Sequence, residues 1–493
     1  MPANAPSSFR PPGELEFATA LAPYSGPWSS RLAAHLARRA GFGGTPQEIA
    51  HLRSLTPGAA VDAFVHFADA SSLAASPSDL PSFAPLGALA NLRNYKMLDP
   101  QARADLQKQI GAARRAGAIS LQTWWLDRML RTPAPLQEKM TLFWHGHYTT
   151  AYGAKGVTPQ DALRQNQLFR SFALGNAHAL TLAVAQDPAM LKYLDNARNN
   201  KTHPNENFAR ELMELYTLGR GNYTEADVRE SARAFTGWTV ERPLLGGGFV
   251  FNQRAHDDGS KTFLGHSGNF DGKAIIDIIY TQPAAARWLA AKLLNAFVYN
   301  DPEPQLIDAT AALIRKNAFE VGSVISTLLR SNVFYSERAY RALVKSPVEL
   351  VVSSMRLFGL RDVNKTVLAS LVRMGQTLFY PPDVKGWDGG AAWLNSQTVL
   401  TRENFASALA NDPQAVRIAS VVGGFSTDPH AVARKLVDVM LEGDASPASI
   451  AGLVAYLGGS ETSALGALSG ENFDERVRGA AYLTMAMPAY QLN

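Results

Sequence analysis

Helical periodicity runs through almost the whole sequence, and it limits the fold to a mainly α architecture. Apolar residues recur every three to four positions, as on a helix with one buried face, and Pro, Gly and capping residues separate the stretches. We predict helices from Arg31 to a glycine stop at Gly41, and over 47–67, 100–131, 135–145, 159–186, 188–196, 205–218, 225–236, 273–281, 283–299, 304–316, 320–331, 337–344, 347–358, 402–409, 430–441, 447–457 and 473–486.

Residues 239–272 depart from this pattern. Glycine is frequent there, FVFN and KTFLG have the composition of short strands, and HDDG has that of a turn. We expect one small β-hairpin or irregular insertion lying over the helical body. The predicted fold class is therefore mainly α, a large multi-helix assembly with this insertion around 239–272.

The length of 493 residues is enough for roughly three domains or one large helical assembly. Residues 1–30 are rich in Pro and Ser and are predicted to form an extended arm. We assign residues 31–410 to a main helical domain, and 411–493 to a C-terminal helical subdomain packed on the main body.

Composition excludes several classes of protein. The apolar share of 46% is that of an ordinary globular chain, and the net charge of +4 comes from basic residues that are spread rather than clustered. The densest basic spots, Arg38–Arg39 and Arg114–Arg115, are too small for a nucleic-acid groove. Cysteine is absent, which excludes disulfides, thiolate nucleophiles and metal sites built on sulfur.

The sequence also bears on location. The N-terminus lacks a basic segment followed by an apolar one, so we expect no signal peptide. No uninterrupted apolar run has membrane-spanning length, so no transmembrane segment is expected. As written, the chain is expected in the cytoplasm, and a periplasmic or extracellular location is expected only if a leader has been removed.

Polar side chains are concentrated in residues 203–238, HPNENFARELMELYTLGRGNYTEADVRESARAFTGW. A helix is predicted to begin at Pro204. At about 100° per residue, one face is apolar and the other is polar. The apolar face holds Phe208, Ala209, Leu212, Met213, Leu215 and Tyr216; the polar stripe holds His203, Asn207, Arg210, Glu211 and Glu214, with Glu206 at its edge.

The second helix of this segment has its own start signal. Thr224 and Asp227 have the spacing of a capping box, with Asp in place of the usual Glu or Gln. The loop at 219–223 is short enough to make the two helices an antiparallel hairpin.

The carboxylates of the polar stripe allow two interpretations. Glu206–Arg210 and Arg210–Glu214 have the i,i+4 spacing of ion pairs on a solvated helix face. Alternatively, Arg210 keeps one carboxylate ionised while apolar packing raises the pKa of another, which would separate a general base from a general acid. Spacing alone favours the solvated face.

His145 and His147 form a candidate metal pair, because imidazole is a common metal ligand. Residues two apart point the same way only on a strand, and the preceding QEKMTLFW is predicted to be helical. We therefore favour a capping or hydrogen-bonding role for this pair over metal ligation. A divalent metal is left open by these residues but is not indicated by their spacing, and no cofactor is identifiable.

Residues 376–396, QTLFYPPDVKGWDGGAAWLNS, are predicted to form an ordered loop, called the aromatic loop below. Its tryptophans stand beside carboxylates and amides, a combination that suits a carbohydrate or another polar ring. The competing interpretation is a loop pinned to the core by its two tryptophans. The polar residues concerned are Asp383, Lys385, Asp388 and Asn395, beside Trp387 and Trp393.

The remaining motifs, and the absence of several well-known ones, limit the classes of enzyme to which the chain could belong. His256 with Asp257 and Asp258 is more typical of a turn than of a catalytic cluster. No nucleophile elbow, Walker loop, dinucleotide fingerprint or zincin motif is present. Serine-hydrolase, P-loop and dehydrogenase chemistries are therefore not expected.

Five segments, in this order, closely resemble the bacterial domain-of-unknown-function family numbered 1800. They are HLARRAGFGGTPQEI, EKMTLFWHGHYTT, DPAMLKYLDNARNNKTHPNENFARELMELYTLGRGNYTEADVRESARAFTGW, KTFLGHSGNFDG and FYPPDVKGWDGGAAWLNSQTVLTREN. The likeness runs from about residue 30 to the end of the chain. It implies no established activity and no catalytic residue, but it marks these polar segments as the hallmark segments of the family.

The resemblance also implies a context. Members of the family are commonly encoded beside exported proteins that look like sulfatases or alkaline phosphatases, which implies an envelope or extracellular polymer setting. A secreted sulfatase- or phosphatase-like protein is therefore the expected partner, and nucleic acid is not expected. The absence of an export signal here departs from that setting.

Two functions follow as hypotheses. The first is an enzyme with carboxylate acid–base chemistry, a hydrolase acting on a glycan or similar polymer; the alternative is a non-catalytic helical binding or assembly protein that works with the partner. In the enzyme, Glu206 and Glu211 form the acid/base pair, Arg210 tunes them, and His145, His147 and His203 orient substrate or water. Substrate would contact Asn207, Asp383, Trp387, Asp388 and Trp393.

Overall fold

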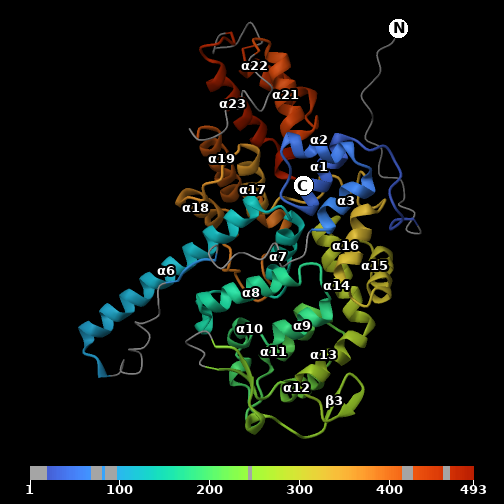
Figure 1. The fold of residues 1–493 in the computed structure, drawn as a ribbon, viewed down its shortest axis with the longest axis vertical. Helices are drawn as coiled ribbons and strands as arrows, with labels where there is room; N and C mark the ends of the chain where they lie inside the picture. The colour runs from blue at the N-terminus through green and yellow to red at the C-terminus, as the bar shows by residue number, and fades with distance from the viewer. Residues whose placement is uncertain (1–18, 68–79, 84–96, 242–246, 413–425, 459–466) are drawn as a thin grey trace.

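The computed structural model describes residues 19–67, 80–83, 97–241, 247–412, 426–458 and 467–493, and residues 1–18 of the predicted arm lie outside this part. The fold is mainly α (Figure 1), as the sequence predicts. The first helices are α1 (Ser30–Ala40), α2 (Pro46–Ser54), α3 (Pro57–Val65), α6 (Pro100–Arg131), α7 (Pro135–His147), η3 (Ala154–Gly156), α8 (Pro159–Ser171), α9 (Ala177–Ala185), α10 (Pro188–Tyr193), η4 (Asn196–Arg198), α11 (Glu206–Glu211), the π-helical turn η5 (Leu212–Thr217) and α12 (Glu225–Ala234).

After the β-strand region the chain is again helical. The C-terminal helices α21–α23 form one end of the molecule, α12 and α13 lie toward the other, and the N-terminal half of α6 projects from the side (Figure 1). These later helices are α13 (Gly272–Thr281), α14 (Pro283–Phe297), α15 (Pro304–Lys316), α16 (Val321–Arg330), α17 (Pro347–Leu357), α18 (Lys365–Arg373), η8 (Gly390–Trp393), α19 (Ser396–Ala410), α21 (Pro429–Leu441), α22 (Pro447–Tyr456), α23 (Phe473–Ala486) and η9 (Pro488–Gln491). No described helix is long and apolar enough to cross a membrane.

The predicted β insertion is present, but it holds two small antiparallel sheets rather than one hairpin. β1 (Trp238–Val240) pairs with β2 (Phe249–Phe251), and β3 (Lys261–Phe263) pairs with β4 (His266–Gly268). The β3–β4 connection is Leu264–Gly265, and both residues have positive φ, as a two-residue turn with right-handed strand twist requires. η7 (Gln253–Ala255) lies between the two sheets in the chain.

Local sequence explains most helix starts. The Thr224–Asp227 capping box predicted for α12 is confirmed, with each side chain bonded to the other residue's backbone N–H. The predicted start at Pro204 is wrong, because α11 begins at Glu206. Asn205 caps it by accepting a bond from Asn207 N–H at 2.9 Å, so that His203 and Pro204 precede the helix.

The structure corrects three other predicted helices and adds one helix that the sequence did not predict. The helix predicted over 47–67 is two helices, because Thr56 caps a new start at Pro57, and the one predicted over 159–186 is broken at 172–176 before Asn176 caps α9. Residues 337–344 form turns, since Arg341 has a φ of 51° and bonds Glu442 and Asp444 through its guanidinium. Helix α18 was not predicted.

The apolar core of the described residues forms two clusters. One is built from helices between α1 and α16, and the other joins α6 to the helices from α17 onward. α7 takes part in the first cluster through Met140 and Trp144, and partly buried Leu142 packs on the second. The domain boundaries predicted from the sequence remain a prediction.

A buried carboxylate joins three helices beside this junction. Glu138 of α7 is fully buried and accepts hydrogen bonds from Trp125 Nε1 (2.9 Å) and Arg128 Nε (2.6 Å) of α6. It also accepts from Arg170 of α8, through Nε at 2.6 Å and Nη2 at 2.8 Å. Although burial acts to raise the pKa of Glu138, the two guanidinium groups outweigh it and lower that pKa overall.

We predict that Glu138→Gln lowers the free energy of unfolding by about 3–5 kcal/mol, because it removes the counter-charge of the buried Arg170 guanidinium and the carboxylate that the partly buried Arg128 bonds. Scanning calorimetry at pH 7 measures the change. Since the folded pKa is depressed, the stabilisation is present above the unfolded pKa and is lost as pH falls through the folded pKa. The variant should therefore lose less stability than the parent on acidification below pH 5.

The control is Asp127→Asn, which removes an exposed i,i+4 ion pair with Arg131 on α6. Such pairs contribute about 0–1 kcal/mol. Equal losses in the two variants would contradict a special role for Glu138.

Candidate functional site

A cavity of about 440 Å³ lies where α7, α14 and the aromatic loop meet, and we call it the HGH cavity. α7 contributes Phe143, Gly146 and His147, α14 contributes Lys292 and Asn295, and the aromatic loop contributes Lys385, Trp387, Asp388, Gly389, Gly390 and Trp393. Two of the hallmark segments, EKMTLFWHGHYTT and FYPPDVKGWDGGAAWLNS, therefore share one cavity wall. Four predicted site residues line it: His147, Trp387, Asp388 and Trp393.

The aromatic loop is held against α7 by a close backbone approach. A Cβ on Gly386 would lie 2.5 Å from the carbonyl oxygen of Gly146. Gly386 also has a φ of +87°, which L side chains rarely adopt. The sequence KGW thus requires glycine for two separate reasons.

His145 fixes the start of the same loop. Its Nε2 accepts a hydrogen bond from Phe379 N–H at 3.3 Å, and its ring packs on Trp125, Phe379 and Trp387. Phe379 has a φ of +67°, a strained conformation for an aromatic residue. Burial lowers the pKa of His145 to about 4, so the imidazole stays neutral at pH 7 and keeps its lone pair for this bond.

His147 connects α7 to the π-helical turn. Its Nε2 donates to the carbonyl oxygen of Tyr216 at 3.0 Å. Burial and the positive charge of Lys292 lower the pKa of His147 to about 3. The hydrogen-bonding interpretation of the histidine pair agrees with these contacts, and the two rings bond different segments.

Charged groups around the HGH cavity are mostly paired. Lys139 forms a buried ion pair with Glu349. Lys385 lies 3.8 Å from Asp383 and 3.8 Å from Asp388, a loose exposed arrangement. Lys292 differs, because burial alone lowers its pKa and no carboxylate offsets that effect.

The polar stripe of α11 is largely engaged in surface ion pairs. Arg210 bonds Glu225 of α12 in bidentate fashion at 2.7 and 2.8 Å, and Glu206 at 3.1 Å. Asn207 donates to the carbonyl oxygen of Leu194 at 3.3 Å. His203 is exposed and lies 3.0 Å from the Thr202 hydroxyl. None of these four predicted site residues lines the HGH cavity.

Glu211 has a different environment. It is half-buried, and burial followed by the negative charge of Glu214 raises its pKa. Burial and then the charges of Asp383 and Glu211 raise the pKa of Tyr193. Glu211 and Asp383, from two hallmark segments, therefore lie around one phenol at the end of α10.

Tyr216 completes this group, which we call the carboxylate cluster (Glu211, Asp383, Tyr193 and Tyr216). Its hydroxyl is buried and has no hydrogen-bond partner among the described residues. Burial and then the charge of Glu211 raise its pKa well above the usual value. The backbone carbonyl of Tyr216 binds His147, so the carboxylate cluster adjoins the HGH cavity through this residue.

The chain forms a π-helix directly after Glu211, over Leu212–Thr217. π-Helical turns are rare and occur frequently at functional sites. Here the Thr217 hydroxyl bonds the carbonyl oxygen of Leu212 at 2.5 Å, and Trp288 Nε1 of α14 bonds that of Leu215 at 2.8 Å. No sequence period predicts this turn.

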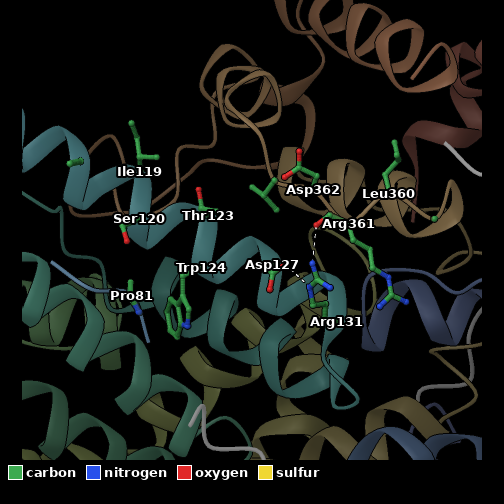
Figure 2. A pocket seen from close by; sticks show the side chains of 13 residues that line it. Pro81, Ile119, Ser120, Thr123, Trp124, Asp127, Arg131, Leu360, Arg361 and Asp362 are labelled. Carbon is green, nitrogen blue, oxygen red and sulfur yellow. Dashed lines mark hydrogen bonds and ion pairs between the residues drawn. The ribbon is translucent and has the colours of Figure 1, made fainter. Parts of the chain in front are cut away.

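A larger groove, of about 1020 Å³, lies between α6 and the turn after α17 (Figure 2). Arg131 lies on its wall and bonds Asp127 at 2.6 Å and the carbonyl oxygen of Arg361 at 3.3 Å. No residue predicted to be functional lines this groove. In the described part of the chain, no three His, Asp or Glu side chains are grouped to hold a metal ion.

Sequence reasoning missed several residues of this region. Glu138 stands between Gln137 and Lys139, so nothing in the sequence marks it as buried, and Tyr193, Tyr216 and Lys292 follow ordinary helical patterns. Their roles come from contacts between helices distant in the chain.

Residues 35–492 match the family described as "Protein of unknown function (DUF1800)", so the chain belongs to this family. No curated protein and no solved structure matches the chain.

We predict that Gly386→Ala destabilises the protein more than Gly375→Ala. Both glycines have positive φ, near +90°, where alanine costs about 1–2 kcal/mol. A Cβ on Gly375 meets nothing within 4 Å, whereas one on Gly386 overlaps Gly146, which adds about 1–3 kcal/mol. Melting temperatures of the two variants and the parent measure the difference, and equal shifts would contradict the close approach.

Proposed function

We propose that this protein is a hydrolase acting on a glycan or similar polymer, with carboxylate acid–base chemistry at the carboxylate cluster. The observation that carries the proposal is that two separate hallmark segments line one cavity, through His147 of α7 and Trp387, Asp388 and Trp393 of the aromatic loop. Glu211 and Asp383 support it, because after burial their charges both raise the pKa of Tyr193. Ion pairs along one solvated helix face would involve only carboxylates of that helix, whereas Glu211 and Asp383 come from separate segments of the chain. The adjoining cavity with two tryptophans provides a wall for a sugar ring.

Glu211 is the proposed general acid. Burial and then the charge of Glu214 raise its pKa, and the opposite effect of Arg210 and Arg220 is smaller, so Glu211 holds a proton to higher pH than an ordinary glutamate. Arg210 is occupied by Glu206 and Glu225, and no hydrogen bond from a cation holds Glu211 ionised in the described structure. Glu206, predicted from the sequence as the partner of Glu211, is better suited to positioning Arg210.

Asp383 is the proposed general base. Its side chain is exposed, and its Oδ1 accepts from the Lys385 N–H at 2.7 Å, which fixes its orientation. In the proposed step, Asp383 takes a proton from water while Glu211 donates one to the departing oxygen. The glycosidic C–O bond breaks and the water oxygen bonds the sugar carbon, so that atoms and charge balance.

The activity test is the release of reducing ends from a panel of neutral and acidic polysaccharides. We expect the parent to cleave at least one of them, and Glu211→Gln and Asp383→Asn each to lower kcat by about 10²–10⁴-fold, as loss of a general acid or base does. Glu206→Gln should stay within a few-fold of the parent. Full activity in Glu211→Gln, or no cleavage of any polymer by the folded parent, would overturn the proposal.

A stability test addresses the same residue without a substrate. Because the folded pKa of Glu211 is raised, the folded state binds the proton more tightly, and stability falls as pH rises through this range. Glu211→Gln should therefore leave the melting temperature at pH 7 unchanged or raise it. Glu206→Gln removes an exposed ion pair and should lower the free energy of unfolding slightly, by less than about 1 kcal/mol. A clear loss in Glu211→Gln would favour a structural role.

The second candidate is the non-catalytic binding or assembly protein that works with a secreted sulfatase- or phosphatase-like partner. The observation that favours it is that His145, His147 and Arg210 all make bonds that support the fold. Under this hypothesis the aromatic loop is an interface. Co-purification of a partner that Trp393→Ala abolishes, together with no polymer cleavage, would support it.

A further inference from the structure

Lys292 is a cation of the HGH cavity without a counter-ion. It lies on α14, half-buried, with its Nζ 4.6 Å from the centre of the Trp288 ring. Lys292 lines the cavity, and its charge helps burial to lower the pKa of His147, another lining residue. Among the described residues no carboxylate forms an ion pair with it or offsets its burial.

The other two lysines of the cavity wall stand beside carboxylates. The buried Lys139–Glu349 pair is neutral as a unit, and Lys385 stands beside Asp388. Among the described side chains that line the cavity, Lys292 is therefore the cation without an ion-pair partner. A half-buried ammonium group has lost part of its hydration, so an anion that binds there regains a strong charge-assisted contact.

The same cavity presents donors suited to a sugar. The side chains of Trp387 and Trp393 are half-buried, and neither indole N–H has a hydrogen-bond partner among the described residues. Indole rings combine an apolar face for a sugar ring with a donor for a hydroxyl. Gly389 and Gly390, between them in the sequence, leave this wall free of side chains.

We infer that the HGH cavity binds a saccharide carrying an anionic group, a carboxylate or sulfate, with the anion at Lys292 and the sugar ring against Trp387 and Trp393. That the ligand is a saccharide rests on the proposed function. The new part of the inference is that this saccharide carries a negative charge. Binding of the anionic saccharide gives Lys292 the ion-pair partner that the described residues do not provide.

The test is calorimetric titration of the parent protein with three matched probes: cellobiose, cellobiouronic acid and a 6-sulfated cellobiose. We expect the two anionic probes to bind at least about tenfold more tightly than cellobiose, with a preference that weakens at high salt. In Lys292→Gln the preference should fall below about twofold. Lys316→Gln removes the same charge from an exposed site that does not line the cavity, and it should retain the preference.

Each outcome decides the inference. A preference for only the carboxylate or only the sulfate identifies the anionic group and supports the inference. Equal binding of all three probes by the parent, or an unchanged preference in Lys292→Gln, would overturn it. Inorganic sulfate that binds as tightly as the sulfated sugar would also overturn it, because the ligand would then be the anion alone. These titrations need no turnover, so Glu211→Gln, inactive if the proposed function holds, should bind the probes like the parent.

Discussion

The architecture around the candidate site depends on one fully buried carboxylate, that of Glu138. A buried carboxylate without partners would cost several kcal/mol, and here Arg128 and Arg170 neutralise it while Trp125 occupies a further acceptor position. These partners come from α6 and α8, so the position of α7 is set from both sides. The direction of α7 in turn decides where the His145–Gly146–His147 sequence at its C-terminal end is presented.

Both histidines at that end serve as neutral hydrogen-bonding groups, and each requires a different tautomer. His145 accepts through Nε2 from Phe379 N–H, so its proton is on Nδ1, whereas His147 donates through Nε2 to the carbonyl of Tyr216. Desolvation makes this possible, since it lowers both pKa values to about 4 and about 3. Gly146 between them leaves its carbonyl open to Gly386. The three residues thus attach the aromatic loop and the π-helical turn to the same helix end.

The sequence predicts the parts of this arrangement that are local. The helix over 100–131 is confirmed at both ends, as are the Thr224–Asp227 cap and the burial of Phe208, Ala209, Leu212, Met213 and Tyr216 on one face. These follow from periodicity and capping within a few residues. The partners of His145, Glu138 and Lys292 lie on other helices, and their contacts arise only when those helices pack. Residues 337–344 show the reverse case. Their local pattern predicts a helix, but they form turns in which Arg341 bonds Glu442 and Asp444 of a distant segment.

The π-helical turn joins the two halves of the candidate site through its carbonyl groups. In this turn the carbonyl oxygens of Leu212, Leu215 and Tyr216 are bonded by the side chains of Thr217, Trp288 and His147. Trp288 also lies under the ammonium group of Lys292, and a Cβ on Gly219 would lie 2.7 Å from its ring. The turn that follows Glu211 therefore contacts Trp288, against which Lys292 of the HGH cavity is placed. The bonds from His147 and Trp288 tie this turn to α7 and α14 of the cavity wall, and Asp383 belongs to the loop that forms the same wall, so the two sites are expected to be positioned as one unit.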